Sequence, residues 1–94
     1  MGLLKSLILA AKSDTRAFNQ ARRLENEINR RLSGQTKISP IQLDHVILEI
    51  TNDKIISQVV LQAVGFQNIN DNSMIIDYNK VFDAILLELN KRYK

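Results

Sequence analysis

Apolar residues recur at alternating spacings of four and three over the first third of the chain. The apolar members of the series are Leu3, Leu7, Ala10, Ala17, Ala21, Leu24 and Ile28, and Asp14 occupies the position between Ala10 and Ala17. Positions spaced in this way lie on one side of an α-helix, so the pattern predicts a long amphipathic helix over about residues 3–32. Asp14 interrupts the series and Ser13-Asp14 is suited to cap a new helix, so a break near residue 13 competes with a continuous helix. Gly34 is suited to the left-handed residue beyond its end.

The middle of the chain contains signals for two shorter helices. Ser39-Pro40-Ile41-Gln42 combines a serine N-cap, a proline at the first helical position and a glutamine that closes a capping box. A helix is therefore expected over about residues 40–50. Thr51-Asn52-Asp53 ends it and caps a second helix over 54–64, which Gly65 closes. Although β-branched residues are dense in 54–64 and favour a strand, the apolar positions repeat at helical spacing, so a helix is preferred.

The last third of the chain begins with a different composition. Residues 66–78 hold a cluster of turn-forming residues followed by the apolar run Met74-Ile75-Ile76. This pattern predicts a loop and a short β segment or hairpin. With Asp77 or Asn79 as N-cap, the following apolar residues predict a final helix that ends near residue 92.

These segments together predict a mainly α fold, a small helical bundle of four to five helices with a short β segment or hairpin near residues 66–78. A chain of 94 residues has room for one hydrophobic core, so residues 1–94 are expected to form a single helical domain. Ile56 and Val60 should lie at the centre of this core. The residues expected to flank them are Leu43, Ile47, Phe82 and Leu86.

Residue types that common catalytic and metal sites require are scarce. The chain has no cysteine, one histidine, and glycines only at positions 2, 34 and 65. Thiol catalysis, zinc–thiolate sites and a glycine-rich phosphate loop are therefore excluded. His45 has no second imidazole and no serine elbow nearby, which favours a structural role, and the carboxylates show no spacing typical of an acid–base pair. We expect a protein that is not an enzyme and uses no cofactor or metal.

Charge is unevenly distributed along the sequence. Residues 1–37 carry eight lysines or arginines against three acidic residues, whereas residues 38–94 carry five against seven. The positive charge belongs to the first predicted helix, where it forms a candidate basic stripe. The members of this stripe are Lys12, Arg16, Arg22, Arg23, Arg30, Arg31 and Lys37. Such a stripe can contact nucleic-acid phosphates, anionic lipid or an acidic protein surface, or it can serve only to keep the helix soluble.

The predicted length of the first helix leads to a functional hypothesis. About 30 helical residues span about 45 Å, which is more than one small core can cover. If the helix is continuous, its start therefore supplies a candidate oligomer seam, formed by Leu3, Leu4, Leu7 and Ile8. If the chain breaks at Ser13-Asp14 instead, the first segment folds back as a short helix and these residues are used within the domain. We expect a cytoplasmic, non-enzymatic protein–protein interaction or assembly module that self-associates through this helix. A protein partner is expected first, nucleic acid second, and a membrane surface third.

A DNA-binding regulator is the first alternative. Residues 39–78 follow the order helix, turn, helix, short β segment, which is compatible with a winged helix. The segment 53–64 would then enter the major groove, and residues 66–78 would form the wing. The mostly apolar side chains of 53–64 argue against this interpretation, because a recognition helix presents polar and basic groups to the bases.

A resemblance provides the second alternative. The chain has a basic helix, a helical pair that ends in Ala63-Val64-Gly65-Phe66, a β segment at Met74-Ile75-Ile76 and a closing helix. This order is similar to that of PUB domains over about residues 20–93, with Gly65-Phe66 as the residue-level match. The resemblance implies a peptide-binding adaptor. The asparagine of that family and its glycine before the central helix have no counterpart at the corresponding places.

Overall fold

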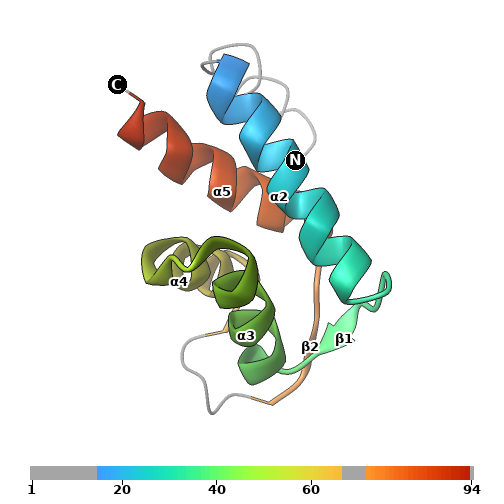
Figure 1. Cartoon of the computed structure of the whole chain (residues 1–94). Helices are drawn as coiled ribbons and strands as arrows, with labels where there is room; N and C mark the ends of the chain where they lie inside the picture. The colour runs from blue at the N-terminus through green and yellow to red at the C-terminus, as the bar shows by residue number, and fades with distance from the viewer. Residues whose placement is uncertain (1–14, 67–71, 94) are drawn as a thin grey trace.

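The computed structural model describes residues 15–66 and 72–93, which form four helices and two short strands (Figure 1). The helices are α2 (Thr15–Arg31), α3 (Pro40–Thr51), α4 (Lys54–Ala63) and α5 (Tyr78–Arg92). The strands β1 (Lys37–Ile38) and β2 (Met74–Ile75) are antiparallel, with Lys37 opposite Ile75 and Ile38 opposite Met74. The fold is mainly α with a short β segment, as the sequence predicts.

Local capping signals fix where three of these helices begin. The Ser39 hydroxyl accepts a hydrogen bond from the Gln42 amide at 3.3 Å, and proline occupies the first turn of α3. Asp53 caps α4 by accepting from the amides of the second and third helical residues at 3.0 and 3.1 Å. Asp77 caps α5 in the same manner. These side chains satisfy amide groups that have no partner within the helix, so the predicted helix starts are confirmed.

The helices α2 and α5 make the most extensive contact between elements in the described part of the chain. Arg16 and Gln20 in α2 contact Tyr93 just after α5. At the opposite end, the Gln35 carbonyl accepts a hydrogen bond from the Tyr78 hydroxyl at 2.6 Å. The two helices are therefore antiparallel, and α3, α4 and the sheet connect them (Figure 1).

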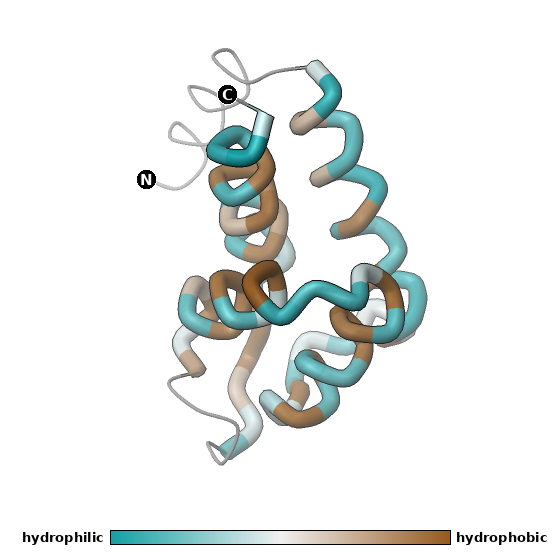
Figure 2. The backbone as a smooth tube through the Cα atoms, turned by 60° about the vertical axis from the view of Figure 1, so that its left-hand side comes forward, coloured by the Kyte–Doolittle hydropathy of each residue, from teal (hydrophilic) through white to brown (hydrophobic). Residues whose placement is uncertain are grey.

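The hydrophobic core is drawn from every helix. Figure 2 shows apolar positions concentrated on α3, α4 and α5, whereas α2 is mostly hydrophilic outside the side that faces the other helices. Val60 is fully buried, and Ile56 is 3% exposed. The predicted flanking residues are buried with them: Leu43, Ile47, Phe82 and Leu86. The central position of α4 in the core is thus confirmed.

The sheet differs from the sequence prediction in its pairing. The β segment lies at Met74–Ile75 within the expected range, but its partner is Lys37–Ile38 rather than a neighbouring segment of a hairpin. The Ile76 amide extends the connection by donating to the Thr36 carbonyl at 2.6 Å. The predicted β segment is therefore present, and among the described residues it pairs with β1. The sequence does not indicate β1, because Lys37–Ile38 is too short to show an alternating pattern and its partner β2 is far away in the sequence.

The long N-terminal helix can be assessed only from residue 15 onward. Its described part is α2, which ends where predicted, with Ser33 and Gly34 in left-handed conformation at φ 55° and 70°. Glycine adopts such a conformation without the steric cost of a Cβ atom. The competing break near residue 13 lies outside the described residues.

Candidate interaction surfaces

The first part of the candidate basic stripe is stacked on aromatic rings. The Arg16 guanidinium lies 4.9 Å from the centroid of the Tyr93 ring, and the Arg22 guanidinium lies 4.4 Å from that of Phe82. Arg22 also lies 3.7 Å from the Glu25 carboxylate. Burial raises the pKa of Glu25, and the positive charge of Arg22 lowers it by a smaller amount. Cation–π contacts of this kind hold a guanidinium against the protein. These two arginines therefore join α2 to α5.

The second part of the stripe is paired with acidic side chains. Arg30 and Arg31 both bind Glu27, one helical turn away, and Arg31 also bonds Glu49 in α3 at 3.1 Å. Hydrogen bonds from Arg30 and then Arg31 lower the pKa of the Glu27 carboxyl. Pairs at this helical spacing are favourable but weak at the surface. Their positive charge is partly neutralised within the protein.

Two further members of the stripe are simply exposed. Arg23 lies on the outer side of α2, and Lys37 lies on β1. Lys12 falls outside the described residues, as do all four residues of the candidate oligomer seam, Leu3, Leu4, Leu7 and Ile8. The structure thus places six stripe residues on or just after α2, but it divides them among ring contacts, ion pairs and open surface.

An ion-pair cluster at the start of α4 was not predicted from the sequence. Arg92, near the end of α5, donates to the two carboxylate oxygens of Asp53 at 2.6 and 3.2 Å and to Glu88 at 2.9 Å. Asp53 is also the N-cap of α4, so one carboxylate serves both contacts. The hydrogen bonds from Arg92, together with those from the Ile56 and Ile55 amides, lower the pKa of Asp53 to about 2, against a smaller opposing effect of burial.

The Asp53–Arg92 contact predicts a specific pH dependence of stability. The pKa of Asp53 is about 2 in the folded protein and about 3.9 in an unfolded chain. Its stabilising contribution is therefore complete above about pH 4 and is lost as the pH falls toward 2. We expect Asp53→Asn, which retains a capping side chain, to cost about 1 kcal/mol at pH 7 after solvent screening and almost nothing at pH 2. Urea unfolding at a series of pH values measures this difference.

Asp77→Asn is the matched control for that prediction, because Asp77 also caps a helix, through the Asn79 amide at 2.9 Å. It measures the cost of exchanging a capping carboxylate for an amide at a second helix start. An Asp53→Asn cost that is equal at pH 7 and pH 2 would contradict the assigned role of Arg92.

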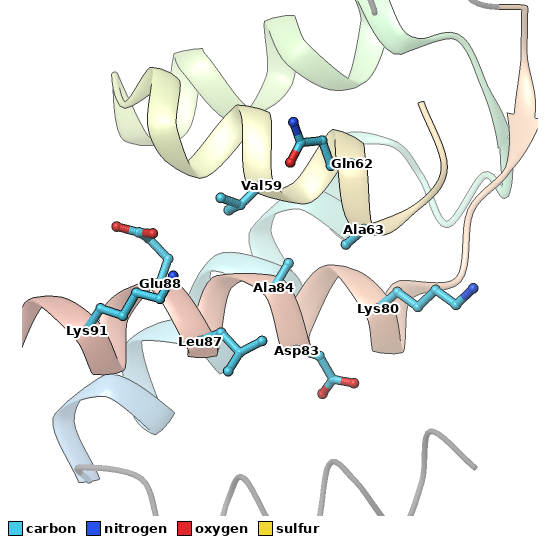
Figure 3. A pocket seen from close by; sticks show the side chains of 9 residues that line it. All are labelled: Val59, Gln62, Ala63, Lys80, Asp83, Ala84, Leu87, Glu88 and Lys91. Carbon is cyan, nitrogen blue, oxygen red and sulfur yellow. The ribbon is translucent and has the colours of Figure 1, made fainter. Parts of the chain in front are cut away.

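A groove of about 370 Å³ lies between α4 and α5 (Figure 3). Its apolar lining comes from Val59 and Ala63 in α4 and from Ala84 and Leu87 in α5, and Leu87 is 42% exposed. The polar side chains that complete the lining are Gln62, Lys80, Asp83, Glu88 and Lys91. An apolar strip bordered by charges of both signs is typical of the surface that receives an amphipathic helix.

The outer surface of α4 also bears on the DNA-binding alternative. Ile56, Ser57 and Val60 are buried, and Ser57 donates a hydrogen bond to Asp44 in α3. The exposed polar side chains of this helix are Lys54, Gln58 and Gln62. One lysine and two glutamines form a small set for reading a DNA groove. The geometry therefore gives little support to α4 as a recognition helix.

His45 lies on the outside of α3. Its side chain is 71% exposed, and its Nε2 atom lies 2.9 Å from Glu49, one helical turn away. Among the described residues, no group of three or more histidine, cysteine or acidic side chains is arranged to hold a metal ion. Within the same residues, no helix has the length and apolar character needed to cross a bilayer.

No family model fits the sequence, and no curated protein or solved structure is significantly similar to it.

Proposed function

We propose that this chain is a non-enzymatic protein–protein interaction or assembly module of the cytoplasm that self-associates through its N-terminal residues. The observation that carries the proposal is the groove between α4 and α5, where apolar side chains remain accessible beside a core that is already formed. The sequence of the candidate oligomer seam, which lies outside the described residues, is also rich in leucine and isoleucine. Exposed apolar surface such as that of the groove marks interaction sites.

The contacts that the arginines of the basic stripe already make within the protein favour a protein partner over nucleic acid. Affinity for DNA grows with the number of phosphates that lysines and arginines neutralise. In α2, Arg16 and Arg22 lie against aromatic rings, and Arg30 and Arg31 share Glu27. Each phosphate contact by one of these arginines would compete with an existing contact. This competition weakens the case for α2 as a phosphate-binding helix.

Sedimentation of the intact protein tests the proposal. We expect the wild-type chain to be a dimer or larger, and Leu4→Ser/Leu7→Ser to reduce the mass to that of a monomer with unchanged helical circular dichroism. Deletion of residues 1–12 should act in the same way and leave residues 13–94 folded. The control is Ile41→Ser, which removes an apolar side chain that is 59% exposed elsewhere on the domain. A monomeric wild type, or a deletion that unfolds the remainder, would contradict self-association through this segment.

The two alternatives differ from this proposal in the partner. A DNA-binding regulator would use the exposed Arg23 and Lys37, and its affinity for duplex DNA would fall steeply with salt and with Arg23→Ala/Lys37→Ala. We expect an anisotropy titration to show no such salt-dependent binding. A peptide-binding adaptor would use the groove as well, but its occupant would be a segment of another protein.

A further inference from the structure

We propose that the groove between α4 and α5 binds an amphipathic helix of another protein, one whose apolar stripe has an acidic residue toward each end. The inference rests on the proposed role of the chain as an interaction module, and it goes beyond self-association by naming the chemistry of a second partner. The shape of the groove, its charge and the charge of this chain's own segments carry it.

The groove has the length and the apolar centre that a short helix requires. Four of the residues that line it on α5 are spaced by four, three and four, which places them in one stripe along the helix. The members of this stripe are Lys80, Ala84, Leu87 and Lys91 (Figure 3). From first to last they rise about 16 Å, or about three helical turns. Val59 and Ala63 form the opposite wall on α4, so a docked helix would meet apolar side chains in the middle and a lysine at each end.

The positive charge at the two ends of the groove is available to a partner, whereas the carboxylates are already engaged. The α4 wall contributes no ionisable side chain to the lining. Of the two carboxylates on α5, Glu88 accepts a hydrogen bond from Arg92 at 2.9 Å, and Asp83 has an interaction of its own. Among the residues that the structure describes, neither Lys80 nor Lys91 forms an ion pair. An acidic helix would therefore find two ammonium groups to pair with, and a basic helix would meet repulsion at both ends.

The segments of this chain are poor matches for that charge pattern. Residues 1–13 contain two lysines and no acidic residue. In α2 the exposed charged side chains are arginines, and Glu27 is bound by Arg30 and Arg31. Glu49 of α3 is bound by Arg31 as well. Charge complementarity therefore favours a different protein over a second copy.

Two synthetic helical peptides of about 15 residues test the inference on the full-length chain. Both carry leucines spaced by three and four on one face. One peptide has glutamate toward each end of that face, and the other has lysine in the same places. In fluorescence anisotropy at about 0.15 M salt, we expect the acidic peptide to bind with a Kd below about 100 μM and the basic peptide to bind at least about tenfold more weakly.

The variant Lys80→Glu/Lys91→Glu should exchange these preferences, weakening the acidic peptide about tenfold and strengthening the basic one. The matched control is Arg23→Glu/Lys37→Glu, which makes the same change in net charge at exposed positions outside the groove. It should alter either Kd by less than about twofold, because charges farther apart than about 8 Å are largely screened. Circular dichroism verifies folding, and if the glutamate pair unfolds, Lys80→Gln/Lys91→Gln should still weaken the acidic peptide about threefold.

An acidic peptide that does not saturate up to about 1 mM, or two peptides that bind equally, would overturn the inference, as would an equal loss of affinity in the control variant. Sedimentation separates these results from self-association. A dimeric chain that fails to bind the acidic peptide contradicts this inference alone, whereas a monomeric chain that binds it at the groove contradicts self-association alone. A dimer that Leu87→Ser converts to a monomer would place a second copy in the groove and overturn the assignment to another protein.

Discussion

We expect replacement of Phe82 with alanine to lower the free energy of unfolding by about 3–5 kcal/mol. The Phe82 side chain is almost fully buried, its ring meets Phe18 edge-on with 5.4 Å between centroids, and the Arg22 guanidinium lies over its face. The substitution leaves a cavity in the contact between α2 and α5 and removes both ring interactions. Because a domain has only about 5–15 kcal/mol of stability, this change removes a large part of the total.

Urea denaturation followed by circular dichroism measures the loss at Phe82, and Phe82→Leu is the matched control. Leucine keeps most of the apolar volume and loses the ring, so we expect a cost of less than about 2 kcal/mol. A cost below about 1 kcal/mol for the alanine variant would mean that α2 does not pack on this face of α5.

Truncation of Ile56 or Val60 to alanine is expected to cost roughly 1–4 kcal/mol at each position. Both side chains point into the core from α4, which contacts α3 on one side and α5 on the other. The adjacent Ile55 is 54% exposed, so Ile55→Ala provides a control that should change stability by no more than about 0.5 kcal/mol. Thermal or urea unfolding of the three variants gives the comparison, and neutral results at both core positions would refute the burial of α4.

The elements that the sequence predicts well are those whose signals are local. Ser39 and Asp53 each mark a helix start because their side chains bond amides two or three residues away. The core positions of α4 follow in the same way, since Ile56 and Val60 are separated by one helical turn. Gly34 marks the end of α2 for a similar reason, because a left-handed residue is needed there.

The features that the sequence does not reveal join residues that are far apart in the chain. The local pattern around Asp53 indicates a cap but gives no sign of Arg92, which lies 39 residues away. The pairing of β1 with β2 is equally remote in sequence. Such contacts are fixed by how the helices pack, and a single sequence contains no spacing that encodes them.

The candidate basic stripe illustrates both cases. The pairs of Glu27 with Arg30 and Arg31 follow from spacings of three and four, which bring side chains together on any helix. The stacking of Arg16 on Tyr93 and of Arg22 on Phe82 depends on the packing of α5 against α2. The sequence therefore identifies the members of the stripe, but it cannot show which of them are held by the protein itself. The groove between α4 and α5 is hidden for the same reason.

The antiparallel pairing of α2 and α5 has a mechanical consequence. Arg16 and Tyr93 adjoin at one end of the pair, close to both ends of the described chain, while Gln35 and Tyr78 adjoin at the other. Tension applied through the two ends would pull Arg16 away from Tyr93 first and then peel the helices apart turn by turn. Only a few contacts bear the load at any moment in this geometry, whereas sliding two helices along each other strains all contacts at once. The domain should therefore yield at low force when it is stretched from its ends.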